Sequence, residues 1–264
     1  MQTPPVALSI AGSDNSAGAG AQADLKTFTA FGVYGLTAIT CVVAEVPGKV
    51  SAIAPVPPEI VAEQIRLSLT AYPVGAVKTG MLHSRAVIEA VCDVLEGARL
   101  VLVVDPVMVA TSGASLLEPE GIDAYRRRLF PLARLITPNL DEAAALLGRP
   151  ISSVAEMREA GRQLCRQFGC AFLLKGGHLQ GEAVDLLCTP EGKVSEFTAP
   201  RVSGVSTHGT GCTLSAAITA GLANGAPLEH AVACAKNFVT RAIAQHYCWP
   251  RRGGETHALN HTQL

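Results

Sequence analysis

A glycine-rich segment late in the chain carries the most specific chemical pattern. It reads Ser206-Thr-His-Gly-Thr-Gly-Cys212-Thr-Leu-Ser215 and runs directly into an apolar helical pattern. Glycines let the backbone approach a ligand closely, and successive amide N–H groups at a helix start bind anions. The helix dipole should also favour the thiolate of Cys212. The segment therefore predicts a site for a phosphoryl group in transfer, although it also fits a plain loop with a small buried cysteine.

Polar residues follow six predicted strands, at the point where each strand ends. They are Gly12-Ser-Asp14, Glu45, Lys78-Thr-Gly-Met81, Asp105-Pro-Val-Met108, Thr137-Pro-Asn139 and Lys175-Gly-Gly-His178. Because ligands gather beyond the carboxyl ends of parallel strands, we expect these residues to share one rim. An acid such as Asp105 suits magnesium, and a lysine such as Lys175 can offer its ammonium to a phosphate. A helix N-cap at Asn139 and an exposed Lys175 are the structural alternatives.

The hydrophobic pattern predicts the elements that position these residues. Apolar strands are predicted at 6–11, 36–44, 76–78, 100–105, 135–137 and 171–175, and helices at 60–71, 86–95, 139–147, 154–168, 212–224 and 228–247. Continuous apolar strands that alternate with helices indicate a parallel sheet covered on both faces. Segments at 182–188 and 193–198 predict an antiparallel hairpin at one edge. The tail, 250–264, is predicted to be frayed or disordered.

The composition and net charge exclude several classes of protein. With 264 residues, 48% of them hydrophobic and 16% charged, the chain fits a single well-buried domain over 1–264. A net charge of −1 gives no field for nucleic acid or an anionic membrane. No apolar run is long enough for a membrane span and no export signal is evident, so we expect a cytoplasmic protein. Eight scattered cysteines without a Cys-x-x-Cys pair indicate reduced thiols.

In combination, these segments resemble the hydroxymethylpyrimidine and phosphomethylpyrimidine kinases of thiamin biosynthesis, a branch of the ribokinase-like superfamily. The superfamily carries Gly-Ala/Thr-Gly-Asp, and the pyrimidine branch Gly-Thr-Gly-Cys, where this chain has Gly209-Thr-Gly-Cys212. The stretch 13–26 is similar to the family's Ser-Asp-Ser-Gly-Gly-Ala-Gly-Ile-Gln-Ala-Asp-Leu-Lys. Asp105-Pro-Val-Met108 and Asn139-Leu-Asp-Glu142 match further family segments. The resemblance spans roughly 6–246 and implies a ribokinase-like three-layer α/β/α fold with a mainly parallel central sheet.

The resemblance also implies an activity, phosphoryl transfer from ATP with Mg²⁺, and a homodimer. It assigns Gly209, Thr210 and Gly211 to an anion hole, Cys212 to the catalytic position, and Lys175 to the phosphates. The implied substrate-binding residues are Gly12, Asp24, Val43, Glu45, Met81 and Val107. The implied nucleotide or phosphate ligands are Thr137, Asn139, Lys175 and Thr207, and the implied magnesium residues are Asp105 and Glu142.

Glu45 departs from the family pattern. The family has Ala-Gln-Asn-Thr where this chain has Ala44-Glu45-Val46-Pro47. The family glutamine reads an aminopyrimidine with one donor and one acceptor, which an ionised carboxylate cannot copy. The mismatch should weaken recognition of the free alcohol by on the order of 1–3 kcal/mol. Our hypothesis is that conversion of the monophosphate to the diphosphate is the principal activity, and that the alcohol step is weaker.

Four other functions are also compatible with parts of the sequence. A pyridoxal or dual-specificity kinase would use the same fold. Gly18-x-Gly20-x-x-Ala23 followed by Glu45 fits a dinucleotide fingerprint, and so an NAD-dependent oxidoreductase, although Gly12 to Ala17 intervene after the strand. A cysteine hydrolase would pair Cys212 with His208, and a non-catalytic ligand-binding protein would need none of these motifs.

Overall fold

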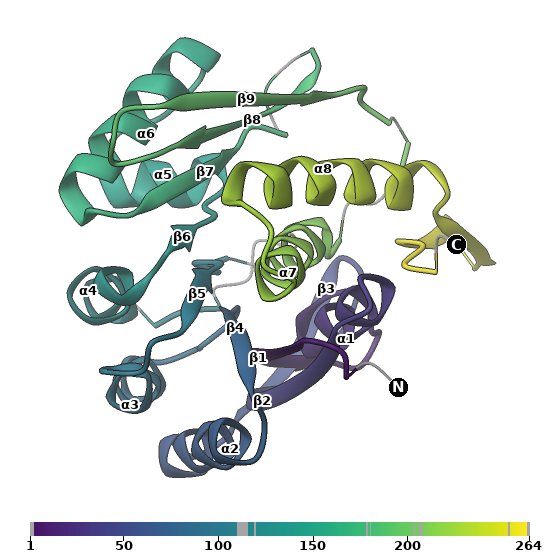
Figure 1. The fold of residues 1–264 in the computed structure, drawn as a ribbon. Helices are drawn as coiled ribbons and strands as arrows, with labels where there is room; N and C mark the ends of the chain where they lie inside the picture. Colours follow the sequence, from purple (N-terminus) through teal and green to yellow (C-terminus); the bar gives the residue numbers. More distant parts are fainter. Residues whose placement is uncertain are drawn as a thin grey trace.

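The computed structural model describes residues 3–109, 116–118, 120–177, 179, 181–202, 204–205, 208–252 and 254–262 (Figure 1). Its elements in chain order are β1 (Val6–Asp14), α1 (Gly20–Ala30), β2 (Tyr34–Val46), β3 (Lys49–Pro55), α2 (Pro58–Ala71), β4 (Val74–Thr79), α3 (Arg85–Leu95), β5 (Val101–Val104), α4 (Gly121–Ala124), η1 (Tyr125–Leu129), η2 (Phe130–Leu132), β6 (Leu135–Ile136), α5 (Leu140–Leu147), α6 (Val154–Phe168), β7 (Ala171–Lys175), β8 (Ala183–Cys188), β9 (Val194–Ala199), α7 (Thr210–Ala223), α8 (Leu228–Ala244), β10 (Tyr247–Arg251) and β11 (Gly254–Ala258).

One sheet runs through the molecule in the order β3-β2-β1-β4-β5-β6-β7-β8-β9. Six neighbouring strands in this order pair in parallel, namely β2, β1, β4, β5, β6 and β7. The predicted hairpin at one edge is confirmed as the antiparallel pair β8–β9. The chain leaves β1 toward β2 on one side and later returns to β4 on the other. This reversal of strand order creates a crevice at the carboxyl ends of β1 and β4.

The strands are apolar on both faces because helices cover both. Leu102 and Val104 of β5 pack with α3 and α6 side chains in one core. Val103, which points the opposite way, packs in a second core with α7 and α8. Figure 1 shows these layers, with α2 to α6 on one face and α1, α7 and α8 on the other. The three-layer ribokinase-like α/β/α architecture expected from the sequence is thus observed.

Local signals fix the helix ends, and α6 shows this best. The Ser153 hydroxyl accepts a hydrogen bond from the Glu156 amide at 3.2 Å, which caps the first turn. Gly169 ends the helix in a left-handed conformation with φ 70°. These two residues explain why the predicted bounds of α6 agree with the structure.

Two segments differ from the sequence prediction. β3 adds an antiparallel edge strand beside β2. It is mostly exposed and carries only two large apolar side chains, so it lacks the continuous apolar pattern of the buried strands. The tail, predicted to be frayed, instead forms the hairpin β10–β11. Beyond it Leu259 and His261 are buried, and His261 Nε2 lies 3.0 Å from the Thr213 hydroxyl of α7. Apolar contacts and this hydrogen bond therefore hold the tail.

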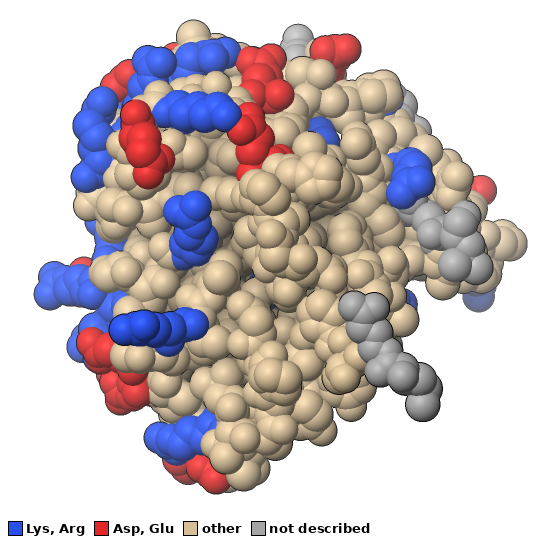
Figure 2. All heavy atoms as spheres, viewed as in Figure 1, with Lys and Arg blue, Asp and Glu red and all other residues tan. Residues whose placement is uncertain are grey.

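Charge is unevenly distributed over the surface. Figure 2 shows lysine, arginine and acidic side chains crowded along the margin where Figure 1 draws α3 to α6, while the centre of the face is mostly uncharged. Within the described ranges, no helix has both the length and the apolar character needed to cross a membrane.

Candidate active site

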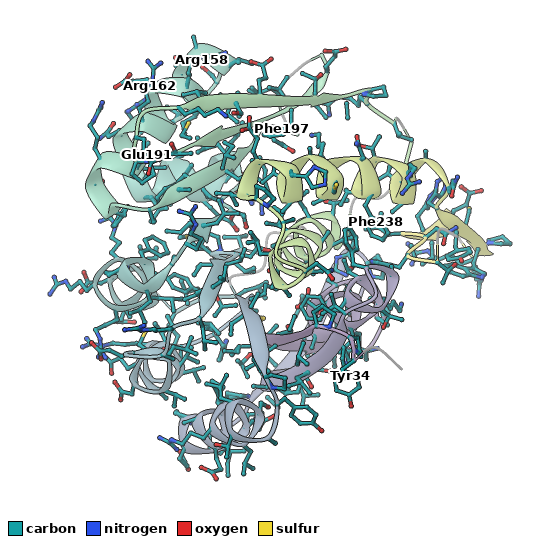
Figure 3. All side chains as sticks on the ribbon, viewed as in Figure 1. Tyr34, Arg158, Arg162, Glu191, Phe197 and Phe238 are labelled. Atoms are coloured by element: carbon teal, nitrogen blue, oxygen red, sulfur yellow. The ribbon has the colours of Figure 1, made fainter. Side chains whose placement is uncertain are left out.

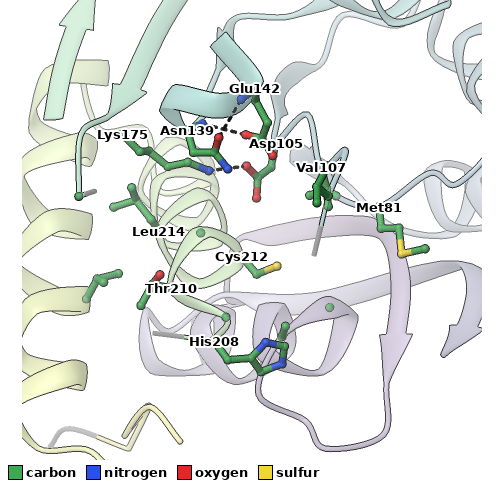
Figure 4. Close-up of a pocket in the computed structure, with 18 of the residues that line it drawn as sticks. Met81, Asp105, Val107, Asn139, Glu142, Lys175, His208, Thr210, Cys212 and Leu214 are labelled. Carbon is green, nitrogen blue, oxygen red and sulfur yellow. Dashed lines mark hydrogen bonds and ion pairs between the residues drawn. The ribbon is translucent and has the colours of Figure 1, made fainter. Parts of the chain in front are cut away.

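A cavity of about 680 Å³ opens at the carboxyl ends of the parallel strands (Figure 4). Most residues that the sequence singled out line it: Gly12, Val43, Glu45, Met81, Asp105, Val107, Asn139, Glu142, Lys175, Gly209, Thr210, Gly211 and Cys212. The strand ends bring them together from distant parts of the chain, as the crevice rule predicts. Thr207 lies outside the described residues.

The start of α7 lies against the loop after β1. Gly209, the N-cap residue, has φ 80°, and a Cβ there would stand 1.8 Å from the Gly18 carbonyl oxygen. Only glycine fits both the backbone angle and this contact. α7 begins at Thr210, so the free amides of its first turn lie at the positive end of the helix dipole, which is the end at the cavity. The arrangement is suited to an anion held at the Gly209–Gly211 backbone.

Lys175 and Asp105 form an ion pair at the cavity wall. Lys175 Nζ donates to Asp105 Oδ1 at 2.8 Å, and the Thr137 hydroxyl donates to the same oxygen at 3.1 Å. Burial alone would raise the pKa of Asp105, but the charges of Lys175 and Lys78, together with the hydrogen bonds from Lys175 and Thr137, lower it. A Cβ at Gly211 would lie 3.2 Å from Lys175 Nζ, so this glycine leaves the ammonium close to the start of α7.

Asn139 and Glu142 cap α5 beside that ion pair. The Asn139 side chain accepts from the Glu142 amide at 2.8 Å, and Glu142 Oε2 accepts from the Asn139 amide at 2.8 Å. Burial, reinforced by the charge of Asp105 and opposed by Lys175, raises the pKa of Glu142 to about 7. Two carboxylates in one cavity, one of them costly to ionise, are oxygen donors that fit a hard cation.

Cys212 lies between the Asp105–Lys175 pair and His208 (Figure 4), and the residue is half-buried. Burial raises its pKa to about 11, although Lys78 favours the thiolate. The charges of Asp24 and Asp105 oppose ionisation as well. The expectation of a thiolate at the helix start is therefore wrong for this structure, because burial and the charges of two carboxylates raise the pKa more than Lys78 lowers it.

Two of the expected ligands lie behind the cavity wall. The Asp24 side chain is fully buried, accepts from Lys78 Nζ at 2.7 and 2.8 Å and from the Ser9 hydroxyl at 2.5 Å, and does not line the cavity. Direct contact of Asp24 with a pyrimidine is thus corrected to a buried ion pair below the site. Thr137 is also fully buried and acts on the site through its hydrogen bond to Asp105.

Asp14, His208 and Glu45 form a cluster to which we gave no joint role from the sequence. His208 Nε2 lies 3.1 Å from Asp14 Oδ2, and one ligand atom of each residue lies within 4.8 Å of the others. Burial would raise the pKa of Asp14, but hydrogen bonds from His208, Ser16 and Ala19 lower it to about 2. Burial and the nearby charge of Asp14 raise the pKa of Glu45. Residues 14 and 208 are 194 positions apart, so no local pattern could pair them.

The hydrogen bonds of Asp14 are inconsistent with the hypothesis that the first loop binds a dinucleotide. Its two carboxylate oxygens accept from the amides of Ser16 at 2.7 Å and Ala19 at 2.8 Å. In a dinucleotide-binding protein, the amides at the start of α1 would have to bind the pyrophosphate. A carboxylate already occupies them and would repel a second anion.

The other end of the cavity is apolar and lies along α8. Val239, Ile243, Pro200 and Val202 line it. A buried ion pair, Lys236 Nζ to Asp185 Oδ2 at 2.7 Å, stands at the same end. The sequence alone suggested no ligand there, because α8 read simply as an amphipathic helix.

Comparisons with known proteins agree with this geometry. The model of the phosphomethylpyrimidine kinase family matches residues 14–257. The hydroxymethylpyrimidine/phosphomethylpyrimidine kinase of Rhizobium meliloti is 48% identical over 241 residues, which cover 90% of each chain. A thiamine biosynthesis bifunctional protein of Geobacter sulfurreducens is 47% identical over 238 residues, 89% of this chain, which spans only 48% of that protein's length.

A solved structure shares the fold over nearly the whole chain. It is an ADP complex of Bacillus subtilis pyridoxal kinase, with a TM-score of 0.87 and 36% identity, covering 97% of this chain and 98% of the other. The Rhizobium enzyme and the Bacillus enzyme are both kinases of small ring compounds by name, and the family model spans every cavity-lining residue except Ala11, Gly12 and Ser13. The chain belongs to the phosphomethylpyrimidine kinase family.

Proposed function

We propose that the protein transfers the γ-phosphoryl group of ATP to 4-amino-2-methyl-5-phosphomethylpyrimidine. One observation carries the proposal: the start of α7, Cys212 and Lys175 meet in the middle of a single cavity. On one side stand β1, β2 and their loops, and on the other stands α8 (Figure 4). Such a cavity has room for two substrates whose reacting atoms meet at the amides of α7.

The division of the cavity supports the direction of transfer. The apolar wall along α8, with Val239 and Ile243, suits an adenine ring, while Gly12, Val43 and Met81 line the part of the same cavity that would take a pyrimidine. Between them, the Gly209–Gly211 amides and Lys175 would stabilise the negative charge that develops on the transferred group. Asp105 and Glu142 would hold magnesium, mostly through water, and such an ion would neutralise charge on the phosphates.

Cys212 would position the accepting oxygen. With a pKa of about 11, its thiol keeps its proton at neutral pH. Phosphoryl transfer passes through a loose transition state in which the accepting hydroxyl needs little activation. A neutral thiol beside the hydroxyl, or beside the phosphate oxygen of a monophosphate, can therefore serve by orientation.

Glu45 supports the monophosphate as the preferred substrate. It is half-buried in the pyrimidine end of the cavity, beside the ionised Asp14. An ionised Glu45 has no donor for an unprotonated ring nitrogen. A substrate that already carries a phosphate gains further contacts at the α7 amides and at Lys175, so we propose that it tolerates the mismatch better than the alcohol.

Pyridoxal phosphorylation is the second candidate. The pyridoxal kinase of Bacillus subtilis shares the fold at 36% identity. In this chain, Glu45 replaces the family glutamine that would form hydrogen bonds with the pyrimidine ring. A pyridine ring has no exocyclic amine, so the two rings need different partners at Glu45.

A substrate panel tests the proposal. Initial rates of ADP release are measured with ATP and Mg²⁺ on the alcohol, the monophosphate and pyridoxal. We expect the highest kcat/KM for the monophosphate, and a loss of about 10²-fold or more in Cys212→Ala on all active substrates. Preference for pyridoxal would select the second candidate. Unchanged turnover by Cys212→Ala would overturn the site itself.

We also propose that two copies associate. Exposed apolar side chains gather on β2 and α2, namely Tyr34, Val42, Ile60 and Leu67. Tyr34 points outward (Figure 3) and stacks on Tyr72 with ring centroids 5.8 Å apart. Light scattering should give the mass of a dimer, and Leu67→Glu should yield monomers.

A further inference from the structure

Three metal-ligating side chains gather on the C-terminal hairpin, away from the cavity. Cys248 of β10 is paired in register with His257 of β11. Glu255 lies two residues before His257, so all three share one face of the hairpin. Tyr247 and Trp249 point to the opposite face. None of the three ligands lines the cavity described above.

Their spacing fits a tetrahedral cation. One ligand atom from each of Cys248, Glu255 and His257 lies within 4.8 Å of the others. His257 Nε2 and Glu255 Oε2 are 3.4 Å apart. Zinc bonds to nitrogen and oxygen of about 2.1 Å place two ligands of a tetrahedron about 3.4 Å apart.

His257 is held as a ligand would be. Its side chain is 12% exposed, and its ring stacks on His246 with centroids 4.9 Å apart. His246 is fixed in turn, because its Nδ1 lies 3.0 Å from the Ile243 carbonyl at the end of α8. His257 Nδ1 is buried without a hydrogen-bond partner among the residues that the structure describes. Nδ1 lies on the other side of the ring from Nε2, and Nε2 faces Glu255, so Nε2 is the atom that would bind the cation.

We propose that Cys248, Glu255 and His257 bind a divalent cation of zinc-like preference, with the fourth position open to solvent. Sulfur, imidazole nitrogen and one carboxylate oxygen are a donor set that selects zinc over magnesium. On binding, the Cys248 thiol releases its proton to the buffer, and the thiolate, imidazole and carboxylate each donate one electron pair to the metal. Cys248 and Glu255 are exposed, so the cation can enter directly from solvent.

The cation would act as a clamp on the tail. It would join β10 to β11. In the chain after β11, Leu259 and His261 are buried, and the His261 ring lies near Phe238 of α8. His261 contacts Thr213 in the helix whose first turn forms the proposed anion hole. Binding to the folded state alone stabilises the protein by mass action. We therefore expect zinc to raise the thermal unfolding midpoint.

Metal titration of the full chain tests the inference. Chelator-treated protein is titrated with Zn²⁺ in excess Mg²⁺, and with Co²⁺, whose absorption reports a thiolate ligand. Wild type should bind about one cation per chain with a thiolate-to-cobalt band. Cys248→Ser should abolish the band, and His257→Gln should weaken affinity on the order of 100-fold. All variants should keep the metal-free unfolding midpoint.

A matched control separates this site from other thiols. Cys234 of α8 lies 3.4 Å from His230 Nε2 and offers a second Cys–His pair. Cys234→Ser should leave the cobalt band and the zinc affinity unchanged. A band that survives Cys248→Ser, or that disappears in Cys234→Ser, would overturn the inference, as would zinc binding that His257→Gln leaves intact.

Discussion

Two lysine–aspartate pairs lie near Cys212, and they differ in exposure. Lys78 at β4 pairs with Asp24 at 2.7 Å, and both side chains are 0% exposed. Lys175 at β7 pairs with Asp105 at 2.8 Å, and these side chains are 14% and 2% exposed. The charges of both lysines act on Cys212. Lys78 borders the cavity, but both side chains of its pair are inaccessible to solvent, whereas Lys175 is partly exposed in the cavity.

The difference shows how one chemical motif serves two purposes. Although burial opposes it, the charge of Asp24 raises the pKa of Lys78, so the ammonium stays protonated and fixed. Lys175 remains accessible to a phosphate. We infer that Lys78–Asp24 builds the floor of the site and that Lys175–Asp105 takes part in transfer.

The largest expected effect is on folding. Asp24→Asn leaves the Lys78 ammonium buried without its carboxylate, which should cost about 3–5 kcal/mol in unfolding free energy. Denaturant unfolding measures it. Asp123→Asn is the control, because it breaks the Arg127–Asp123 pair, whose side chains are 76% and 54% exposed, and should cost less than about 1 kcal/mol. Equal costs for the two variants would show that the buried Lys78–Asp24 pair stabilises the fold no more than an exposed surface pair does.

The next effect is on catalysis. Lys175→Met should lower kcat/KM by about 10²–10³-fold, the loss typical of one charge-stabilising donor. Steady-state kinetics measures it, with Lys193→Met, a 62% exposed surface lysine, as the control. If Lys175→Met kept wild-type kinetics while losing stability, Lys175 would be another structural lysine.

Glu45 provides a smaller and more selective effect. Glu45→Gln should improve kcat/KM for the alcohol by about 5–150-fold, equivalent to about 1–3 kcal/mol, and should change the monophosphate less. The raised pKa of Glu45 adds a pH test. As pH falls toward that pKa, the protonated acid gains a donor, so KM for the alcohol should fall in wild type relative to Glu45→Gln. Parallel pH profiles would contradict this role.

Cys212 should contribute little to pH dependence. With a pKa of about 11, its thiolate is about one part in a thousand at pH 8. If the thiol only positions the acceptor, kcat/KM should vary less than about twofold between pH 7.5 and 9.5 on its account. A tenfold rise per pH unit that Cys212→Ala abolishes would instead identify the thiolate as the base.

The sequence predicted the sheet, most helices and most of the cavity lining because strand ends and glycine loops are local signals. It chose the wrong contact for Asp24, since an acid in the first turn of a helix looks the same whether it faces a ligand or a buried lysine. It missed the His208–Asp14 contact and the apolar wall of α8, because these depend on how distant elements pack. The thiolate expectation for Cys212 failed because a helix start is visible in sequence, whereas burial is not.

A crystal structure with a non-hydrolysable ATP analogue and the pyrimidine alcohol tests the central claim most directly. We predict that the terminal phosphate lies on the amides of Gly209–Gly211, within reach of Lys175, and that the hydroxyl lies beside Cys212. Phosphates bound against Gly18 at the start of α1, with the α7 amides left to solvent, would contradict the account.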